Sequence, residues 1–327
     1  MVVAKDNAWI EGMSGSKISP YLSEQLVYIG QLDSYERGSE IAAQLMGVQT
    51  NDTAIYRLTD EVGEQCKALE EHKEYRHPIE LNEEEYLYVQ CDGSMLLTRT
   101  SGWKEAKLGR VFKSSSLYEQ STDRQWLRHS EYVVHIGSHT VFEDLLSKLI
   151  DEPYRQHERR IVFVIDGARW QWSWIEAEYP NAIQILDFYH VMEHISQLIK
   201  TCFRQQKKRA EQLEYLGSLL KTQGVQAVEK QLAQLPQTTQ LQRDTYHKLS
   251  TYIDNNRTRM NYPDYLAQGL LIGSGAIESA HRTVLQRRMK LSGQRWSEQG
   301  LTNMAKLRAI NMSGYWNEVT DIIRAAA

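Results

Sequence analysis

Apolar positions recur at helical spacing over the first fifth of the chain. Between residues 21 and 70 they lie three or four apart, and a short turn containing Gly47 separates two such stretches. The pattern predicts two amphipathic helices joined as in a helix-turn-helix, within a region of residues 1–80. Small helical bundles share this pattern, and the second stretch offers only Arg57 amid several acidic residues. DNA recognition and a scaffold role therefore both stay open for these helices.

Near residue 85 the period changes from helical to alternating. EYLYVQCDGSMLLTRT contains two β-rich runs separated by Asp92-Gly93, the dipeptide that favours a tight hairpin turn, and GRVFKSSSLY suggests a third strand. EYVVHIGS is a further short apolar run, and VFEDLLSKLID has helical spacing. RIVFVIDGARW and AIQILDFYH are continuous apolar runs that end at Asp166 and Asp187. A meander followed by strand, helix and strand predicts an α/β sheet covered by helices, over residues 81–192.

Residues 193–270 have helical character throughout and are rich in Lys, Arg, Gln and Glu, with a turn at Leu235-Pro236. We interpret this block as an all-helical insertion. A strand-like LLI then leads into IGSGAIESAHRTVLQRRMKLSGQRW. Residues 271–327 are expected to complete the α/β module and to end in basic helices.

Composition limits the class of protein. With 327 residues and 41% hydrophobic content, the chain is large enough for two or three modules. No stretch has the roughly 18 apolar residues that span a bilayer, and the first residues lack a basic start followed by an apolar run. We therefore expect a cytoplasmic protein with no membrane contact. The three cysteines (Cys66, Cys91 and Cys202) are too far apart for a CxxC zinc site or a disulfide framework.

Charge is unevenly distributed along the chain. A net charge of -4 and a pI near 6.2 argue against a surface coated with nucleic-acid-binding cations. One late stretch nevertheless contains a single acidic residue, Glu298, among many cations. These cations are Arg282, Arg287, Arg288, Lys290, Arg295, Lys306 and Arg308. The stretch predicts a basic face on one module.

Three carboxylates have the placement of a catalytic cluster. Asp92 and Asp166 each end a predicted strand, and Glu278 lies just inside a glycine-flanked helix start. Carboxylates crowded into one cleft require protons or cations, and two hard divalent ions could relieve the repulsion and activate water for attack on phosphorus. Taken singly, each Asp is more often structural, as a turn residue or a helix cap. The combination favours a metal site.

Two other motifs have competing interpretations. LLIGSGAIES contains Gly-x-Gly after a strand-like run, but a nucleotide-binding loop needs a small residue where Glu278 stands. His190 and His194 are one helical turn apart and could bind zinc, yet no third ligand is evident nearby. We assign Asp187 and His190 to shaping the cleft.

DGARWQW, ILDFYHVMEH and IGSGAIESAHRTVLQRRMKLSGQRWSE, in this order, resemble bacterial insertion-sequence transposases of the Kra group within the Mutator-like DDE assemblage. The resemblance covers residues 81–327 and, less firmly, the helices before them. It implies an RNase H-like core with the triad Asp92, Asp166 and Glu278, an Asp-x-x-His signature at Asp187 and His190, and a helical insertion domain. Relatives usually carry a cysteine-rich zinc module first, and its absence here suggests a truncated or remnant element.

The expected function is cleavage of DNA ends and their transfer to target DNA, with two Mg²⁺ or Mn²⁺ ions and a homo-oligomer on double-stranded DNA. The expected phosphate contacts are Arg282, Arg287, Arg288, Lys290 and Arg295. Two alternatives remain: a catalytically idle DNA-binding protein derived from a transposase, and a nuclease without strand transfer.

Overall fold

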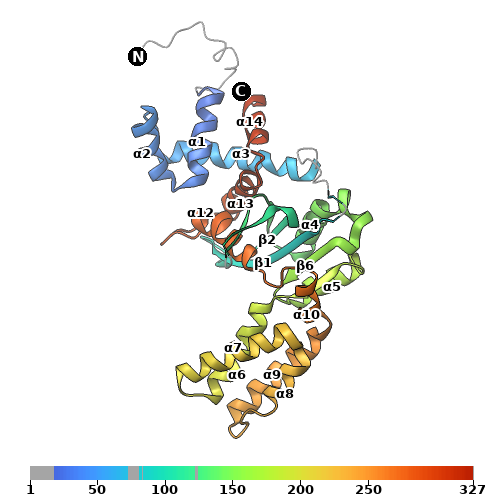
Figure 1. Cartoon of the computed structure of the whole chain (residues 1–327). Helices are drawn as coiled ribbons and strands as arrows, with labels where there is room; N and C mark the ends of the chain where they lie inside the picture. The colour runs from blue at the N-terminus through green and yellow to red at the C-terminus, as the bar shows by residue number, and fades with distance from the viewer. Residues whose placement is uncertain (1–17, 73–80, 83, 122–123, 327) are drawn as a thin grey trace. The chain divides into compact units, whose positions relative to one another are not determined.

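The computed structural model describes residues 18–72, 81–82, 84–121 and 124–326 (Figure 1). Among these residues, the chain divides into two compact units. The first combines the described residues within 1–85, 91–156 and 277–327, and the second combines residues 86–90 and 157–276. These units group the chain differently from the four segments expected from the sequence. No helix within the described ranges is long and apolar enough to cross a membrane.

The order of elements alternates helical blocks with strands. The helices of the first unit are α1 (Pro20–Leu32), α2 (Tyr35–Met46), α3 (Asp52–His72), α4 (His139–Tyr154), α12 (Arg287–Met289), α13 (Glu298–Met312) and α14 (Trp316–Ala325), with a π-helix at His281–Gln286. The helices of the second unit are α5 (Arg169–Glu178), α6 (Phe188–Cys202), α7 (Gln206–Gln223), α8 (Val225–Leu232), α9 (Gln240–Asn256) and α10 (Tyr262–Ala267). The helix α11 (Gly275–Ala280) begins in the second unit and ends in the first. Short 3-10 helices are Ser114–Ser116, Arg155–Arg160 and Arg257–Arg259.

A five-stranded mixed sheet has the order β5-β2-β1-β6-β7. Its strands are β1 (Leu87–Leu97), β2 (Trp103–Lys113), β5 (Glu131–Ile136), β6 (Ile161–Ile165) and β7 (Ile183–Leu186). β2 pairs antiparallel with β5, whereas β6 pairs parallel with β1 and β7. A separate antiparallel pair is formed by β3 (Leu117–Ser121) and β4 (Arg124–Leu127). The predicted α/β class with flanking helices is therefore confirmed.

The hairpin turn lies elsewhere than the sequence predicted. Asp92 and Gly93 are inside the continuous strand β1, and the turn to β2 is made by residues 98–102. Thr98 N–H donates to the Gly102 carbonyl (2.9 Å), and Gly102 has a φ of 68°, which favours glycine. The predicted turn at Asp92-Gly93 was wrong because β1 continues across it to Leu97, in a sheet where β1 lies beside β2.

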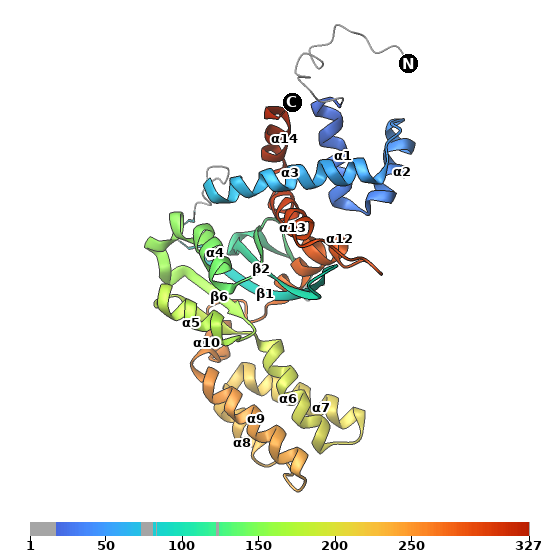
Figure 2. The same cartoon turned by 180° about the vertical axis from the view of Figure 1, so that it is seen from behind.

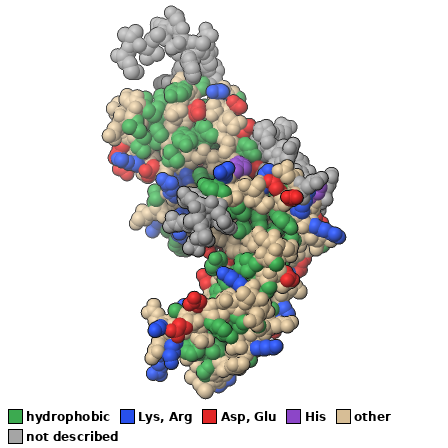
Figure 3. Space-filling view, in the orientation of Figure 1, with side chains coloured by type: hydrophobic (Ala, Val, Ile, Leu, Met, Phe, Trp, Pro, Cys, Tyr) green, Lys and Arg blue, Asp and Glu red, His purple; other side chains and the backbone are tan. Residues whose placement is uncertain are grey.

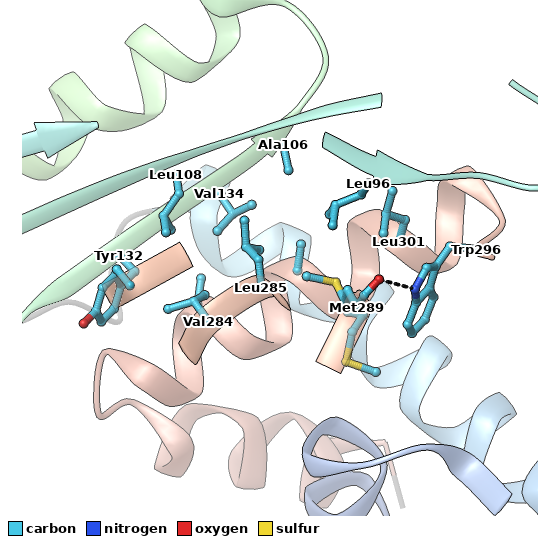
Figure 4. Packing of buried hydrophobic residues seen from close by; sticks show 14 of the residues in the cluster. Leu96, Ala106, Leu108, Tyr132, Val134, Val284, Leu285, Met289, Trp296 and Leu301 are labelled. Carbon is cyan, nitrogen blue, oxygen red and sulfur yellow. Dashed lines mark hydrogen bonds between the residues drawn. The ribbon is translucent and has the colours of Figure 1, made fainter. Parts of the chain in front are cut away.

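The first unit is built around α13, which contacts α3 and β5 (Figures 1 and 2). The close approach of α3 depends on Gly63, where an added Cβ would lie 2.8 Å from Asn303 Cβ. Asn303 donates its side-chain N–H to the Asp60 carbonyl at the same crossing (3.1 Å). The apolar core between sheet and helices contains Leu96, Ala106, Leu108, Tyr132, Val134, Val284, Leu285, Met289, Trp296 and Leu301 (Figure 4).

The predicted N-terminal helices are present as α2 and α3. Gly47 ends α2 in the left-handed conformation (φ 67°), and Ser34 caps its start by accepting from Arg37 N–H. These features confirm the two helices and the turn. The side chains of Arg57, Asp60, Glu61 and Glu64 line one groove on α3, so the face around Arg57 is acidic overall.

The second unit contains the predicted helical block, which begins at Phe188 and continues to Ala267. Asp187 caps α6, and Thr239 and Gln242 form a capping box at the start of α9. Leu270–Ile272, expected to be strand-like, has no regular secondary structure. One hydrogen bond joins this segment to β1, from Leu271 N–H to the Tyr88 hydroxyl. Another joins it to α6, from Phe188 N–H to the Ile272 carbonyl.

Candidate functional site

In the first unit, Asp92 lies beside the helix that carries Glu278. Its carboxylate Oδ2 is 3.6 Å from His281 Nε2, and Oδ1 accepts a hydrogen bond from Gly93 N–H (2.6 Å). Glu278 is exposed in the first turn of α11 and precedes His281 by three residues. Residues three apart on a helix lie on one face. Asp92 therefore lies next to the helical turn that follows Glu278.

His281 is the residue of this site that the sequence interpretation missed. Its side chain is buried, and neither ring nitrogen has a hydrogen-bond partner among the described residues. Burial lowers the pKa of His281, although the nearby Asp92 charge raises it in part. The lowered pKa favours the neutral imidazole of His281 next to the Asp92 carboxylate. The spacing Glu-x-x-His in GAIESAH was the signal available in the sequence.

The helix after Glu278 is a π-helix rather than a regular α-helix, over His281–Gln286. Arg308 on α13 donates from Nε to the Val284 carbonyl (2.5 Å) and from Nη2 to the Thr283 carbonyl. A buried cation thus satisfies backbone carbonyls inside the π-helix. Single π turns are frequent at functional sites, and this one begins at the residue that contacts Asp92.

In the second unit, Asp166 directly follows β6, as predicted. Its Oδ1 accepts from Ala168 N–H (3.4 Å), and its backbone carbonyl accepts from the Tyr252 hydroxyl (3.4 Å). Gly167 has a φ of 103°, and an added Cβ would lie 2.9 Å from Leu186 Cδ1. The backbone after Asp166 is therefore fixed by α9 on one side and by a glycine-only turn on the other.

Asp187 joins α6 to the segment that leads into α11. Its Oδ1 accepts from His190 N–H (2.6 Å), and its Oδ2 accepts from Ser274 N–H. Asp187 is only 3% exposed, so its carboxylate is committed to these backbone groups. It therefore acts in this structure as a structural clamp at the start of α6.

The two histidines of α6 pack on an aromatic ring of α9. His194 stacks on Tyr252 with ring centroids 4.1 Å apart, and His190 lies edge-on to His194 at 5.0 Å. Burial raises the pKa of Tyr252, and the neighbouring Asp166 and Asp187 raise it further. Burial also lowers the pKa of His194. Tyr252, whose hydroxyl donates to the Asp166 carbonyl, thus stays protonated with the His194 ring stacked on it.

No group of three or more His, Cys, Asp or Glu side chains arranged to hold a metal occurs within the described parts of the chain. The described residues therefore include no third ligand that would complete a zinc site with His190 and His194. The nucleotide-loop alternative requires a strand directly before the glycines, and the residues directly before Gly273 form no strand. Asp92 and Glu278 belong to one unit and Asp166 to the other. The convergence of all three carboxylates remains a prediction.

The expected basic face is only partly at the surface. Arg282, Arg287, Lys290 and Arg295 are exposed, whereas Arg288 is fully buried (0% exposed). The Arg288 guanidinium packs over the rings of Tyr35 (4.6 Å) and Trp296 (5.0 Å), so this arginine is not available as a phosphate contact.

Two further cations of the same stretch also lie inside the fold. Lys306 and Arg308 are buried, and burial lowers the pKa of Lys306 to about 8. On the side shown in Figure 3, Lys and Arg side chains are interspersed with acidic ones. The exposed cations after Glu278 are therefore fewer than the sequence suggested.

Comparison with known proteins gives a family without an assigned activity. No curated protein matches the chain. A family model matches residues 9–322, which is nearly the whole sequence. The chain belongs to the uncharacterised protein family UPF0236.

Proposed function

We propose that this protein is a metal-dependent DNA transposase that cleaves phosphodiester bonds and joins the resulting 3′ ends to target DNA. The observation that carries the proposal is the approach of Asp92 to the helical turn of Glu278 through His281. Asp92 on β1 is partly exposed and Glu278 on α11 is exposed, and both carboxylates supply hard oxygen donors. These two residues are also the ones that the resemblance to DDE transposases assigns to the catalytic triad.

The strand pairing supports Asp166 as the third member. In the parallel pairing of β1 with β6, Val89 is opposite Phe163. Asp92 and Asp166 each follow these paired residues by three positions in their own segment. We therefore propose that the sheet is RNase H-like and that Asp166 is the third carboxylate of the triad.

The donor set fits Mg²⁺ or Mn²⁺. Mg²⁺ is usually bound by one or two carboxylates, with waters and substrate phosphates completing its shell, so a preformed cage of three protein ligands is not required. Bound there, two such ions would stabilise charge on the phosphoryl oxygens and activate the attacking water or 3′ hydroxyl. The protein's own contribution is to fix Asp92 against buried His281 and to hold Asp166 at a rigid strand end.

The test uses DNA that flanks the gene at its own locus. Purified protein should nick the element ends with Mg²⁺ or Mn²⁺ and join them to a plasmid target, and EDTA should stop both reactions. Cleavage without joining would assign the nuclease alternative instead. DNA binding with no cleavage under any divalent cation would assign the idle DNA-binding protein.

Phosphate binding by the exposed cations gives a separate prediction. Replacing Arg282 and Arg287 together by Ala should lower the log-log salt slope of duplex binding by about 2, because each phosphate contact releases condensed counterions. The measurement is fluorescence anisotropy over a salt series. The matched control replaces Arg37 and Lys67, which are already paired with Glu40 (2.5 Å) and Glu64 (2.8 Å). If the control lowered the salt slope equally, the phosphate contacts would lie on the N-terminal helices.

A further inference from the structure

A pocket of about 410 Å³ opens in the first unit, and none of its lining residues belongs to the proposed metal site. Tyr35 and Tyr56 line it from α2 and α3, Arg99 from the β1–β2 turn, and Arg295 and Trp296 from the segment before α13. The volume is within the range of small-molecule sites, roughly 300–1,000 Å³. Three aromatic rings and two guanidinium groups therefore surround one space.

The three aromatic rings of the pocket contact one another. The Tyr35 ring lies 5.5 Å from the Tyr56 ring and 6.4 Å from the Trp296 ring, both in edge-on geometry. Trp296 is fixed by a hydrogen bond from Nε1 to the Met289 carbonyl (3.2 Å, Figure 4) and by its backbone N–H donating to the Leu97 carbonyl. Tyr56 remains 37% exposed, which leaves ring surface free for stacking.

The charges around the pocket favour an anion. Arg99 and Arg295 form no ion pair with any described acidic residue, and Arg99 Nε donates to the Arg295 carbonyl (3.3 Å). One acid, Asp52, also lines the pocket, and its Oδ1 accepts from Thr53 N–H (2.7 Å) and the Thr53 hydroxyl. The two arginines therefore outnumber the acid at the pocket wall.

A third cation lies behind the rings. The Arg288 guanidinium packs over both Tyr35 and Trp296 from inside the core, and its two terminal nitrogens have no hydrogen-bond partner among the described residues. A cation on the buried side offsets the negative π-face of each ring. This makes the aromatic wall better suited to an electron-rich or anionic ligand than to a cationic one.

We propose that this pocket binds one unpaired nucleotide of a DNA strand, with the base stacked on Tyr56 and the flanking phosphate held by Arg99 and Arg295. Aromatic rings combined with arginines are the recurrent means of binding single-stranded nucleic acid. The inference goes beyond the proposed function and requires only that the chain binds DNA, whether or not it cleaves it.

The test compares two labelled DNA duplexes in EDTA, one blunt and one with a short single-stranded 3′ overhang. The wild type should bind the overhang duplex about tenfold more tightly, as expected from one stacked base. Tyr56→Ala should lose this preference and keep its affinity for the blunt duplex. Tyr56→Phe, which keeps the ring, should retain the preference and shows that the pocket is intact.

A second variant, Arg295→Gln, tests the phosphate contact. It should lower the log-log salt slope of binding to the overhang duplex by about 1 more than that of binding to the blunt duplex. The control is Arg57→Ala, an exposed cation next to Tyr56 in sequence, which should change both duplexes equally. Deoxyadenosine monophosphate serves as a competitor. In large excess, this free nucleotide should remove the overhang preference, because it carries the same base and phosphate groups. A folded Tyr56→Ala variant that keeps the preference would overturn the proposal.

Discussion

Asp92→Asn is expected to lower the rate of Mg²⁺-dependent DNA cleavage roughly 10³-fold. The amide keeps the shape of the side chain and can still accept from Gly93 N–H, so the strand should be preserved. It loses the charge that holds a divalent cation, and loss of that electrostatic stabilisation costs about 4 kcal/mol in the transition state. The measurement is single-turnover cleavage of the element end.

Metal binding by the same variants can be measured without DNA. Mg²⁺ or Mn²⁺ should raise the melting temperature of the wild type by mass action, and Asp92→Asn, Asp166→Asn and Glu278→Gln should each lose this shift. Glu211→Gln, an exposed acid on α7, is the matched control and should keep both the shift and cleavage. Cleavage at the wild-type rate by Asp92→Asn would rule out the proposed two-metal site. If only Asp166→Asn lost the metal-dependent shift in melting temperature, Asp92 and Glu278 would not be metal ligands.

The strands that end at Asp166 and Asp187 were predictable because each is a short apolar run buried between neighbours, and such runs carry their signal locally. The turn at Asp92-Gly93 was not, because a dipeptide preference of this kind is weaker than pairing with strands on both sides. β1 lies between β2 and β6; its pairing with β6 covers Leu87–Val89, and the strand continues past Gly93 to Leu97. The extent of β1 thus depends on the strands beside it and not on the dipeptide alone.

The basic stretch shows a different limit. Arg287 and Arg288 are indistinguishable in sequence, yet the first is exposed and the second fully buried. The partners that bury Arg288 are Tyr35 and the Gly30 carbonyl, about 250 positions earlier in the chain. His281 is marked in the sequence by the spacing Glu-x-x-His, but its approach to Asp92 is seen only in the fold.

Arg288→Ala is expected to destabilise the first unit by about 3 kcal/mol. The substitution removes a guanidinium that donates from Nε to the Gly30 carbonyl (2.9 Å) and packs over Tyr35 and Trp296. A hydrogen bond from a charged donor contributes roughly 1.5–3 kcal/mol, and a desolvated cation–π contact about 2 kcal/mol. The cavity left among α1, α2 and the Trp296 segment adds to the loss. The midpoint of urea denaturation, followed by tryptophan fluorescence, measures it.

The neighbouring residue provides the control. Arg287→Ala changes an exposed side chain and should shift stability by no more than about 0.5 kcal/mol. Arg288→Met should fall between the two, because it fills the space and removes two unpaired buried nitrogens but leaves the Gly30 carbonyl without its donor. Equal denaturation midpoints for Arg287→Ala and Arg288→Ala would contradict the burial of Arg288 and would return it to the set of exposed phosphate contacts.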